Sequence, residues 1–402
     1  GLRPHRRQTL MFGRRVAITG LGVLAPCGSG RTDFWQGLLG PGITGTKSTA
    51  IPDWDPTPYF DSPKDARRAD RVEQFGLAAA AEAFASAGNI DVDPERFGVV
   101  VGTGIGGLNT LEEQVRVLIE KGERRVSPFL VPMMMANATG AAISMKYGLQ
   151  GPNETICTAC AASTHALGYA ARLIASGRCD AMVSGGAESA ATPVSLAGFG
   201  NMTALSTSGS SRPFDRDRDG FVMGEGAAIF ILEEWNHAAN RGANILGEIL
   251  GAASNADAHH ITAPSPGGRG AISCMRMALD DAGIGSESIM HVNAHGTSTP
   301  LNDAAEAAAV ASVFGSRRPP ITSIKGVTGH ALGAAGALEA ASVLLAFEHR
   351  LIPPTAGTTT PDPEMDIDLV IGAARPWTPG PTISNNFGFG GHNGSIILAP
   401  AS

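Results

Sequence analysis

Short apolar runs that stop at a glycine or a histidine are the feature that most constrains this chain. They are too short for helices and too apolar for half-exposed strands, so they indicate buried strands. Segments rich in small residues, with apolar side chains at helical spacing, lie between them. This alternation predicts an α/β fold. The predicted strands are Val16–Thr19 (ending in a turn at Gly20 and Gly22), Val99–Val101, Ala181–Ser184, Ala227–Leu232 and Met290–Ala294, and the predicted helices include Gln74–Gly88, Ala161–Ala175, Ala271–Ala282, Ala304–Phe314 and Ala331–Phe347.

Length and composition exclude several classes of protein. A chain of 402 residues suggests two to three domain-sized units or one large two-part core. Apolar residues make up 43% and charged residues 17%, which excludes a disordered chain. No apolar run approaches the ~20 residues that a membrane span needs. The formal net charge of -7 argues against a nucleic-acid partner.

The cysteines and the N-terminus indicate a compartment. An odd, scattered set of cysteines is not a disulfide framework, so we expect a reducing cytoplasm. Residues 1–13 are basic and contain no acidic residue, and no apolar signal core follows them. We expect an N-terminal extension or a cloning remnant there, with a targeting peptide as the alternative. The cysteines are Cys27, Cys157, Cys160, Cys179 and Cys274.

Cys157 and Cys160 form a C-x-x-C pair that allows several interpretations. A redox pair and two ordinary buried cysteines both stay open, whereas zinc would need two further ligands and none is near. A third interpretation fits better. Ile156 ends a short strand and residues 161–175 are helical, so Cys160 lies at a strand-to-helix elbow. The free N–H groups there lower a thiol pKa and stabilise an oxyanion, which predicts a covalent nucleophile.

Two histidines and one lysine stand in unusual settings. His295 directly follows a predicted strand, and His330 directly precedes a predicted helix. Lys325 is one of only five lysines and lies in an otherwise uncharged run. Alone, each histidine would more often be structural. Together with the cysteine elbow, they form a candidate catalytic group.

Two other patterns carry less weight. Residues 102–107 contain G-x-G-x-x-G after a strand, but no acidic residue ends a second strand about 20 residues on, which disfavours a dinucleotide site. His259 and His260 lack an acidic partner at a metal-motif spacing, so we expect a loop and no metal site.

Six blocks of sequence resemble the signature motifs of the β-ketoacyl-acyl carrier protein synthases, and in particular of the elongating KAS II group. The blocks follow the family's order and span the chain from about Arg15 to Leu398. They are Thr158-Ala-Cys-Ala-Ala-Ser163, Arg212-Pro-Phe-Asp215, Asp219-Gly-Phe-Val-Met-Gly-Glu-Gly226, Ala294-His-Gly-Thr-Ser-Thr299, Lys325-Gly-Val-Thr-Gly-His330 and Asn386-Phe-Gly-Phe-Gly-Gly-His-Asn393.

The resemblance implies a fold, an activity and partners. The fold would be thiolase-like: two similar α/β halves, residues 14–250 with the nucleophile and residues 251–402 with the histidines, in five layers, α-β-α-β-α. The activity would be decarboxylative condensation of malonyl-acyl carrier protein with an acyl group on Cys160, as in fatty-acid biosynthesis. No cofactor would be bound, because substrates ride on the phosphopantetheine arm of acyl carrier protein. The chain would form a homodimer, or a heterodimer with a chain-length partner.

The resemblance also implies roles for single residues. His295 and His330 would donate hydrogen bonds to the malonyl thioester carbonyl, and Lys325 would hold them, paired to Glu306 with Asp303 in support. The backbone N–H groups of Cys160 and Phe389 would form the oxyanion hole, and Phe389 would act as a gate. The other implied site residues are Thr297 and Thr299 for the pantetheine, Ile105, Phe199 and Met202 for the acyl tunnel, and Arg67, Arg68, Arg71, Arg124 and Arg125 for carrier-protein docking.

Two positions depart from the common pattern of the family. Thr203 stands where many housekeeping members carry arginine, and Ala263 stands where a hydroxyl residue is common. Both would lie near the mouth of the pantetheine channel. The partner carrier protein would therefore differ from the general fatty-acid carrier.

Four other functions are compatible with parts of this sequence. A ketosynthase of a specialised type II polyketide pathway would share the chemistry. A non-catalytic chain-length partner usually lacks the nucleophilic cysteine. The presence of Cys160, His295 and His330 disfavours this interpretation. A thiolase or an initiating enzyme would carry one histidine and one asparagine beside the cysteine. The two histidines of this chain disfavour that interpretation. A redox protein would use Cys157 and Cys160 equally.

Overall fold

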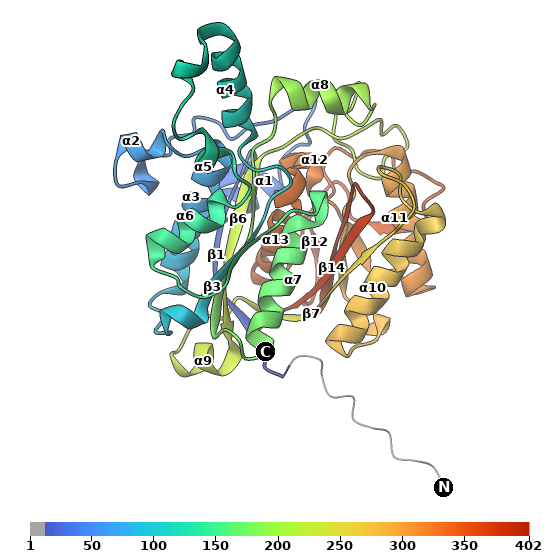
Figure 1. Ribbon diagram of the computed structural model, residues 1–402. Coiled ribbons are helices and arrows are strands. Elements are labelled where there is room, and N and C mark those ends of the chain that lie inside the picture. The colour runs from blue at the N-terminus through green and yellow to red at the C-terminus, as the bar shows by residue number, and fades with distance from the viewer. Residues whose placement is uncertain (1–12, 402) are drawn as a thin grey trace.

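The computed structural model describes residues 13–401, and most of its strands join one 12-stranded sheet (Figure 1). A separate two-stranded sheet pairs β10 with β12. The strands are β1 Val16–Ala25, β2 Gly28–Ser29, β3 Phe97–Gly102, β4 Asn153–Ile156, β5 Ala181–Glu188, β6 Gly226–Glu234, β7 Gly247–Ala256, β8 His291–Asn293, β9 Pro320–Thr322, β10 Leu351–Ile352, β11 Asp368–Leu369, β12 Arg375–Pro376, β13 Thr382–Gly388 and β14 His392–Ala399.

The two halves of the large sheet repeat one pattern of pairing. In the first half β1–β6 and β6–β5 are antiparallel, whereas β5–β3 and β3–β4 are parallel. In the second half β7–β14 and β14–β13 are antiparallel, whereas β13–β8 and β8–β9 are parallel. β1 also pairs with β7, and this contact joins the halves. The implied pair of similar halves is therefore visible in the topology, although the sequence shows no repeat.

The helices form three layers around these strands. α3 and α6 cover the outer face of the first half, and α10, with α11 beside it, covers the second half (Figure 1). α7 and α13 pack against each other between the halves, which gives the implied α-β-α-β-α order. The helices are α1 Arg31–Leu38, α2 Pro63–Ala66, α3 Arg71–Ala87, α4 Leu108–Lys121, α5 Leu130–Met134, α6 Ala138–Tyr147, α7 Ala162–Ala175, α8 Pro193–Asn201, α9 Trp235–Asn240, α10 Arg269–Ala282, α11 Pro300–Phe314, α12 Lys325–Thr328 and α13 Ala335–His349.

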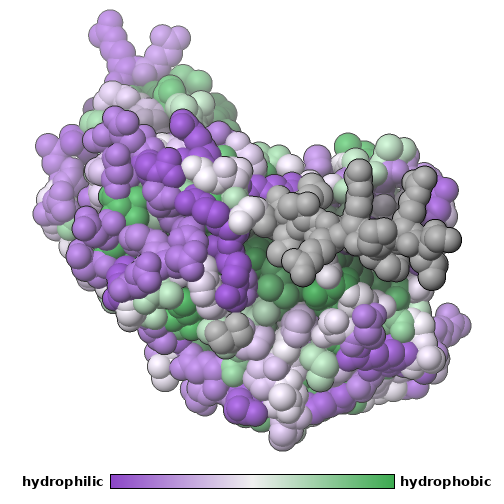
Figure 2. All heavy atoms as spheres, turned by 90° about the horizontal axis from the view of Figure 1, so that it is seen from below, coloured by the Kyte–Doolittle hydropathy of each residue, from purple (hydrophilic) through white to green (hydrophobic). Residues whose placement is uncertain are grey.

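The central layer explains the high content of small residues. Every residue of α13 from Ala335 to Phe347 is buried. A Cβ added at Gly102 would lie 2.4 Å from the backbone nitrogen of Ser163 in α7, so the strand approaches the helix backbone directly. The face seen from below is different: it is mainly hydrophilic, with apolar residues gathered in a hollow near its centre (Figure 2).

The predicted turn at Gly20 and Gly22 is wrong, because β1 runs through both glycines to Ala25. A Cβ at Gly20 would lie 2.4 Å from the carbonyl oxygen of Ala83, and one at Gly22 would lie 1.9 Å from that of Ala79. The glycines therefore let α3 pack closely on β1. They do not end the strand.

Three other sequence expectations concern organisation. The expected extension at residues 1–13 lies, except for Gly13, outside the described residues. The division into halves at residue 250 stays a prediction. Within residues 13–401, none of the helices has both the length and the apolar character needed to cross a bilayer.

Candidate active site

Cys160 lies at the predicted strand-to-helix elbow. β4 ends at Ile156, a single 3₁₀ turn spans Ala159–Ala161, and α7 follows directly. Ala159 has a φ of +50°, a conformation that is uncommon for a residue with a side chain, so the elbow is a tight turn. The second half contains a similar tight turn before a helix. Leu332, with a φ of +43°, is the first residue of the 3₁₀ turn that leads into α13.

The structure brings Cys160, His295 and His330 together from three distant parts of the chain. All three residues are buried. The Sγ atom of Cys160 lies 3.0 Å from Nε2 of His330. The two imidazole rings stand nearly perpendicular, with 5.3 Å between their centroids. One ligand-type atom of each of the three residues lies within 4.8 Å of the others, so one small substrate group can contact all three.

The surroundings of His295 fix the position of its proton. Nζ of Lys325 and Nδ2 of Asn386 each lie 3.3 Å from Nδ1 of His295. Both groups can only donate hydrogen bonds, so Nδ1 must accept. The proton of the neutral ring is therefore on Nε2. His295 is a hydrogen-bond donor through that atom.

Lys325 is held differently from the prediction. It pairs with Glu339 of α13 and donates to the backbone carbonyl of His295 at 2.5 Å. Asn386 completes the group by donating to the other Glu339 carboxylate oxygen at 2.7 Å. The implied pairing of Lys325 with Glu306 is wrong.

Glu306 and Asp303 instead shape the loop that follows β8. Glu306 accepts hydrogen bonds from the backbone N–H groups of His295 and Gly296, each at 2.8 Å. Asp303 accepts those of Thr297 at 3.0 Å and Ser298 at 3.1 Å. Both carboxylates lie on α11 and are buried, so they fix the backbone that carries His295 and the threonines.

Sequence reasoning missed Glu339 and Asn386. Each left a signal in the sequence. Glu339 is the only acidic residue in the predicted helix Ala331–Phe347, and an acid in a buried helix needs a partner. Asn386 is the first residue of the block that runs from Asn386 to Asn393, but the sequence predicted no role for it.

Burial dominates the electrostatics of the site. It lowers the pKa of His295 and His330 well below the ordinary value, and the charge of Lys325 lowers both further. Both rings are therefore neutral at physiological pH. Burial also raises the pKa of the Cys160 thiol to about 12, although Lys325 and the backbone N–H of Phe389 act in the opposite direction. The predicted lowering by the helix N-terminus is thus outweighed in the unliganded site, because desolvation disfavours the thiolate more strongly.

Two backbone amides favour the thiolate form of Cys160. The N–H groups of Phe389 and of Cys160 itself both interact favourably with the Cys160 thiolate. Phe389 lies in the turn between β13 and β14, next to Gly390 and Gly391, which both have positive φ. Its ring lies 6.3 Å from that of Phe199, measured between centroids. The predicted oxyanion hole of these two amides is consistent with this arrangement and stays a prediction.

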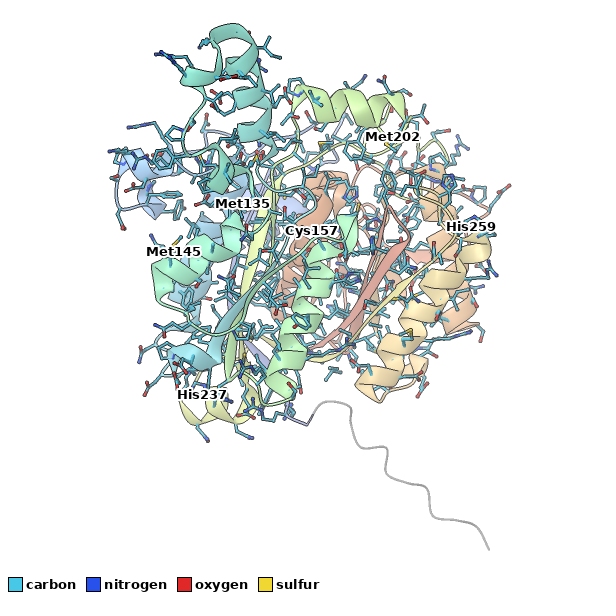
Figure 3. All side chains as sticks on the ribbon, viewed as in Figure 1. Met135, Met145, Cys157, Met202, His237 and His259 are labelled. Carbon is cyan, nitrogen blue, oxygen red and sulfur yellow. The ribbon has the colours of Figure 1, made fainter. Side chains whose placement is uncertain are left out.

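A cavity of about 400 Å³ leads to Cys160. The expected tunnel residues Ile105, Phe199 and Met202 and the expected pantetheine residues Thr297 and Thr299 all line it. Thr203 and Ala263 line it as well, and the described residues around it include no lysine or arginine. Met202 directly follows α8, near the top of the molecule in Figure 3.

None of the five arginines expected to dock a carrier protein lines this cavity. Arg67, Arg124 and Arg125 are exposed. Arg68 stacks its guanidinium on the Phe129 ring at 4.2 Å. Arg71 is held by the buried carboxylate of Glu225 at 2.5 Å, so it stabilises the fold and contributes little to an open surface.

The remaining patterns have structural explanations. In the G-x-G-x-x-G segment, the N–H of Gly104 donates to buried Glu188, which also accepts the N–H of Gly333, so the loop is fastened to the second elbow. Cys157 is exposed whereas Cys160 is buried. Nδ1 of His260 accepts the N–H groups of Thr262 and Ala263, each at 3.1 Å, which supports the expected loop.

The fold and the site are those of a ketosynthase, and comparison with known families agrees. The family "Beta-ketoacyl synthase, N-terminal domain" matches residues 42–238, and "Beta-ketoacyl synthase, C-terminal domain" matches residues 246–359. The chain belongs to the β-ketoacyl synthase family. It is 43% identical over 408 residues to 3-oxoacyl-[acyl-carrier-protein] synthase 2 of Synechocystis sp., covering 96% of this chain and 98% of the relative.

Solved structures point to related enzymes as well. The ishigamide ketosynthase/chain length factor is 33% identical, with a TM-score of 0.91, and the match covers 97% of this chain and 100% of that one. A type II PKS acyl-carrier protein in complex with its ketosynthase bound to the hexaketide gives 32% identity and a TM-score of 0.89, with the same coverage. The thiolase-like fold implied by the sequence is confirmed.

The Lys325–Glu339 pair gives a prediction about stability. Lys325→Met should lower the free energy of unfolding by about 3–5 kcal/mol at alkaline pH, because it leaves the Glu339 charge buried without a partner. Burial already raises the pKa of Glu339 to about 7. The variant raises it further, so the folded state binds more protons than the unfolded state and the loss of stability grows as pH rises. Urea unfolding at pH 5 and pH 8 measures the effect, and Lys325→Met/Glu339→Gln should recover part of it. An equal loss at both pH values would contradict this account.

Proposed function

We propose that this protein condenses an acyl group held as a thioester on Cys160 with malonyl-acyl carrier protein, which extends the chain by two carbons in fatty-acid biosynthesis. The observation that carries the proposal is the contact between the Cys160 thiol and Nε2 of His330, with the Nε2–H of His295 beside it. The family of the chain and its relative named 3-oxoacyl-[acyl-carrier-protein] synthase 2 support it.

In the first step, the Cys160 sulfur attacks the acyl thioester carbonyl. The thiol proton moves to Nε2 of His330, 3.0 Å away, and then to the departing carrier thiolate. Among residues 13–401, no group hydrogen-bonds to Nδ1 of His330, so its tautomer is not fixed. The ring can therefore accept a proton here and donate from Nε2 in the next step. The two amides of the oxyanion hole hold the tetrahedral intermediate.

In the second step, malonyl-carrier protein replaces the first carrier. The Nε2–H groups of His295 and His330 donate to the malonyl thioester carbonyl. The bond to the carboxyl carbon breaks, carbon dioxide leaves, and its electron pair forms an enolate. Neutral imidazoles suit this role, because they donate a hydrogen bond and lose no proton.

In the third step, the enolate carbon attacks the acyl-Cys160 carbonyl. A carbon–carbon bond forms, and the bond between that carbon and the sulfur breaks. The Cys160 thiolate takes a proton from Nε2 of His330, which a proton from solvent replaces. Loss of carbon dioxide drives the sequence, and no bound cofactor takes part. The substrates are carried on the phosphopantetheine arm. Thr297 and Thr299 form hydrogen bonds with the amides of that arm.

A polyketide pathway is the second candidate, because one similar solved structure is a type II PKS acyl-carrier protein in complex with its ketosynthase. Thr203 and Ala263 at the cavity favour a dedicated carrier protein. Turnover over a series of acyl chain lengths with a fatty-acid carrier and a polyketide carrier distinguishes the pathways. Product from a saturated acyl chain with the fatty-acid carrier supports the first. Turnover with the polyketide carrier alone supports the second.

We also propose that the protein is a homodimer. The helices α4 to α6 expose apolar side chains. Among residues 13–401, no strand pairs with the outer side of β4, which ends the large sheet. Figure 3 shows Met135 and Met145 on this side of the molecule. Such a patch next to an open edge fits a second copy. Light scattering measures the mass, and a monomer at micromolar concentration would contradict the proposal. The exposed apolar residues are Leu111, Val115, Leu118, Ile119, Val131, Met135 and Met145.

The exposed Arg67 and the half-buried Arg68 give a prediction about carrier-protein binding. Arg67→Glu/Arg68→Glu should raise the KM for carrier protein about tenfold with little change in kcat, because carrier proteins are acidic and surface charges act mainly on association. The effect should shrink at high salt. Arg276→Glu on α10 is a matched control for the single variant Arg67→Glu, because each reverses one charge at an exposed arginine, in different halves of the fold. An unchanged KM would remove these arginines from the docking surface.

A further inference from the structure

The oxyanion hole of the proposed function uses amides from two separate segments of the chain. One amide belongs to Cys160, in the elbow before α7, and the other to Phe389, in the turn between β13 and β14. These segments belong to different halves of the fold. The spacing of the two segments decides whether both N–H groups reach one oxygen atom. Contacts between the segments must therefore fix this spacing.

His165 makes hydrogen bonds to both segments. It lies in the first turn of α7. Its Nδ1 is 2.8 Å from Oγ1 of Thr158, two residues before Cys160. Its Nε2 is 2.9 Å from the carbonyl oxygen of Asn393, which pairs with Phe387 across the β13–β14 hairpin.

The direction of each hydrogen bond follows from the chemistry of the partners. A carbonyl oxygen only accepts, so Nε2 of His165 carries the proton and donates to Asn393. Nδ1 then has a free lone pair, and the Thr158 hydroxyl must donate to it. Burial lowers the pKa of His165, which keeps the ring neutral and preserves both bonds at physiological pH.

The backbone around the ring is packed closely. A Cβ added at Gly394 would lie 3.0 Å from Cδ2 and Nε2 of His165, so the strand lies directly on the ring. A Cβ at Gly388 would lie 3.0 Å from the backbone nitrogen of Cys160. The hairpin and the elbow therefore touch beside the hole, and a shift in one is transmitted to the other.

We propose that His165 is a positioning residue that aligns the Cys160 and Phe389 amides through Thr158 and Asn393. It controls formation of the tetrahedral intermediate at Cys160. Decarboxylation depends on the separate group of His295 and His330 and does not need this alignment. The inference rests on the proposed function, because that function assigns the two amides to acyl transfer.

The test measures three reactions of His165→Leu, which removes both hydrogen bonds. Acylation of Cys160 by an acyl thioester, followed by quenching and mass spectrometry, should slow about 10²-fold, the effect of losing or misplacing one oxyanion donor. Alkylation of the thiol by iodoacetamide needs no oxyanion hole and should change less than about threefold. Decarboxylation of malonyl-carrier protein, compared between Cys160→Ala and Cys160→Ala/His165→Leu, should also be nearly equal.

Conservative variants separate alignment from general damage. His165→Gln places an amide N–H near the Nε2 position and should recover part of the acylation rate. Thr158→Val removes the hydroxyl donor and should slow acylation, and Thr158→Ser should recover most of that loss.

Two results would overturn the positioning role. Acylation of His165→Leu at the wild-type rate would do so, and so would an equal loss in all three reactions, which indicates a general structural role. If the wild-type protein is itself not acylated at Cys160, the proposed function fails instead. The two failures are thus distinguishable.

Discussion

Cys160→Ala should lower the rate of condensation by about 10⁴-fold or more, because it removes the only atom on which the acyl group is held. His330 loses its contact with the sulfur in this variant, but its ring still packs against Phe221 and His295. The pair of histidines should therefore stay in place. Slow decarboxylation of malonyl-carrier protein should therefore persist. The measurement is product formation from acyl- and malonyl-carrier protein, together with release of carbon dioxide.

Cys157→Ala is the matched control for this prediction. Cys157 lies three residues away and is exposed, whereas Cys160 is buried against His330. We expect condensation by Cys157→Ala to stay within about twofold of wild type. Mass spectrometry of the acylated protein should place the acyl group on Cys160. An acyl group on Cys157, or equal loss of activity in both variants, would favour the redox interpretation and end the assignment of the nucleophile.

The sequence predicted the local geometry around Cys160 well. Ile156 closes a strand and residues 161–175 read as a helix, and the structure places β4 and α7 there. A strand-to-helix elbow is a local feature, so its signal lies within about twenty residues. The residues that meet at the sulfur, His295 and His330, could be singled out only by their settings and by the resemblance to a family.

The partners of Lys325 could not be predicted from the sequence. Glu306 and Glu339 are both acids on helices near the histidines in the chain. The choice between them depends on α13 passing between the two halves of the sheet, which places Glu339 beside Lys325. Glu306 faces backbone N–H groups instead. Long-range packing decides such pairs.

The pKa of Cys160 shows the same limit in its energetics. The sequence identifies a helix N-terminus, which stabilises a thiolate. It does not show how completely the thiol is buried. Burial is the larger effect and raises the pKa to about 12, so the thiol depends on a neighbouring base in this site. His330 at 3.0 Å is that base in the proposed reaction.

The two histidines should differ when each is replaced by alanine. His295→Ala should lower the rate of decarboxylation by about 10²–10³-fold, the effect of removing one preorganised donor to an oxyanion. Acyl loading should stay within about threefold of wild type, because Nε2 of His295 is committed as a donor and the ring does not accept the thiol proton. His330→Ala should slow both reactions, since its Nε2 contacts the sulfur as well.

The experiment follows acyl loading by mass spectrometry and carbon dioxide release from malonyl-carrier protein in both variants. Thermal unfolding checks that each variant folds, because His295 also contacts Lys325 and Asn386. A loss of acyl loading in His295→Ala as large as its loss of decarboxylation would contradict the division of roles. Equal losses of both reactions in the two variants would show that the fixed tautomer of His295 does not distinguish it from His330. The contact between Cys160 and His330 would then have no separate part in acyl transfer.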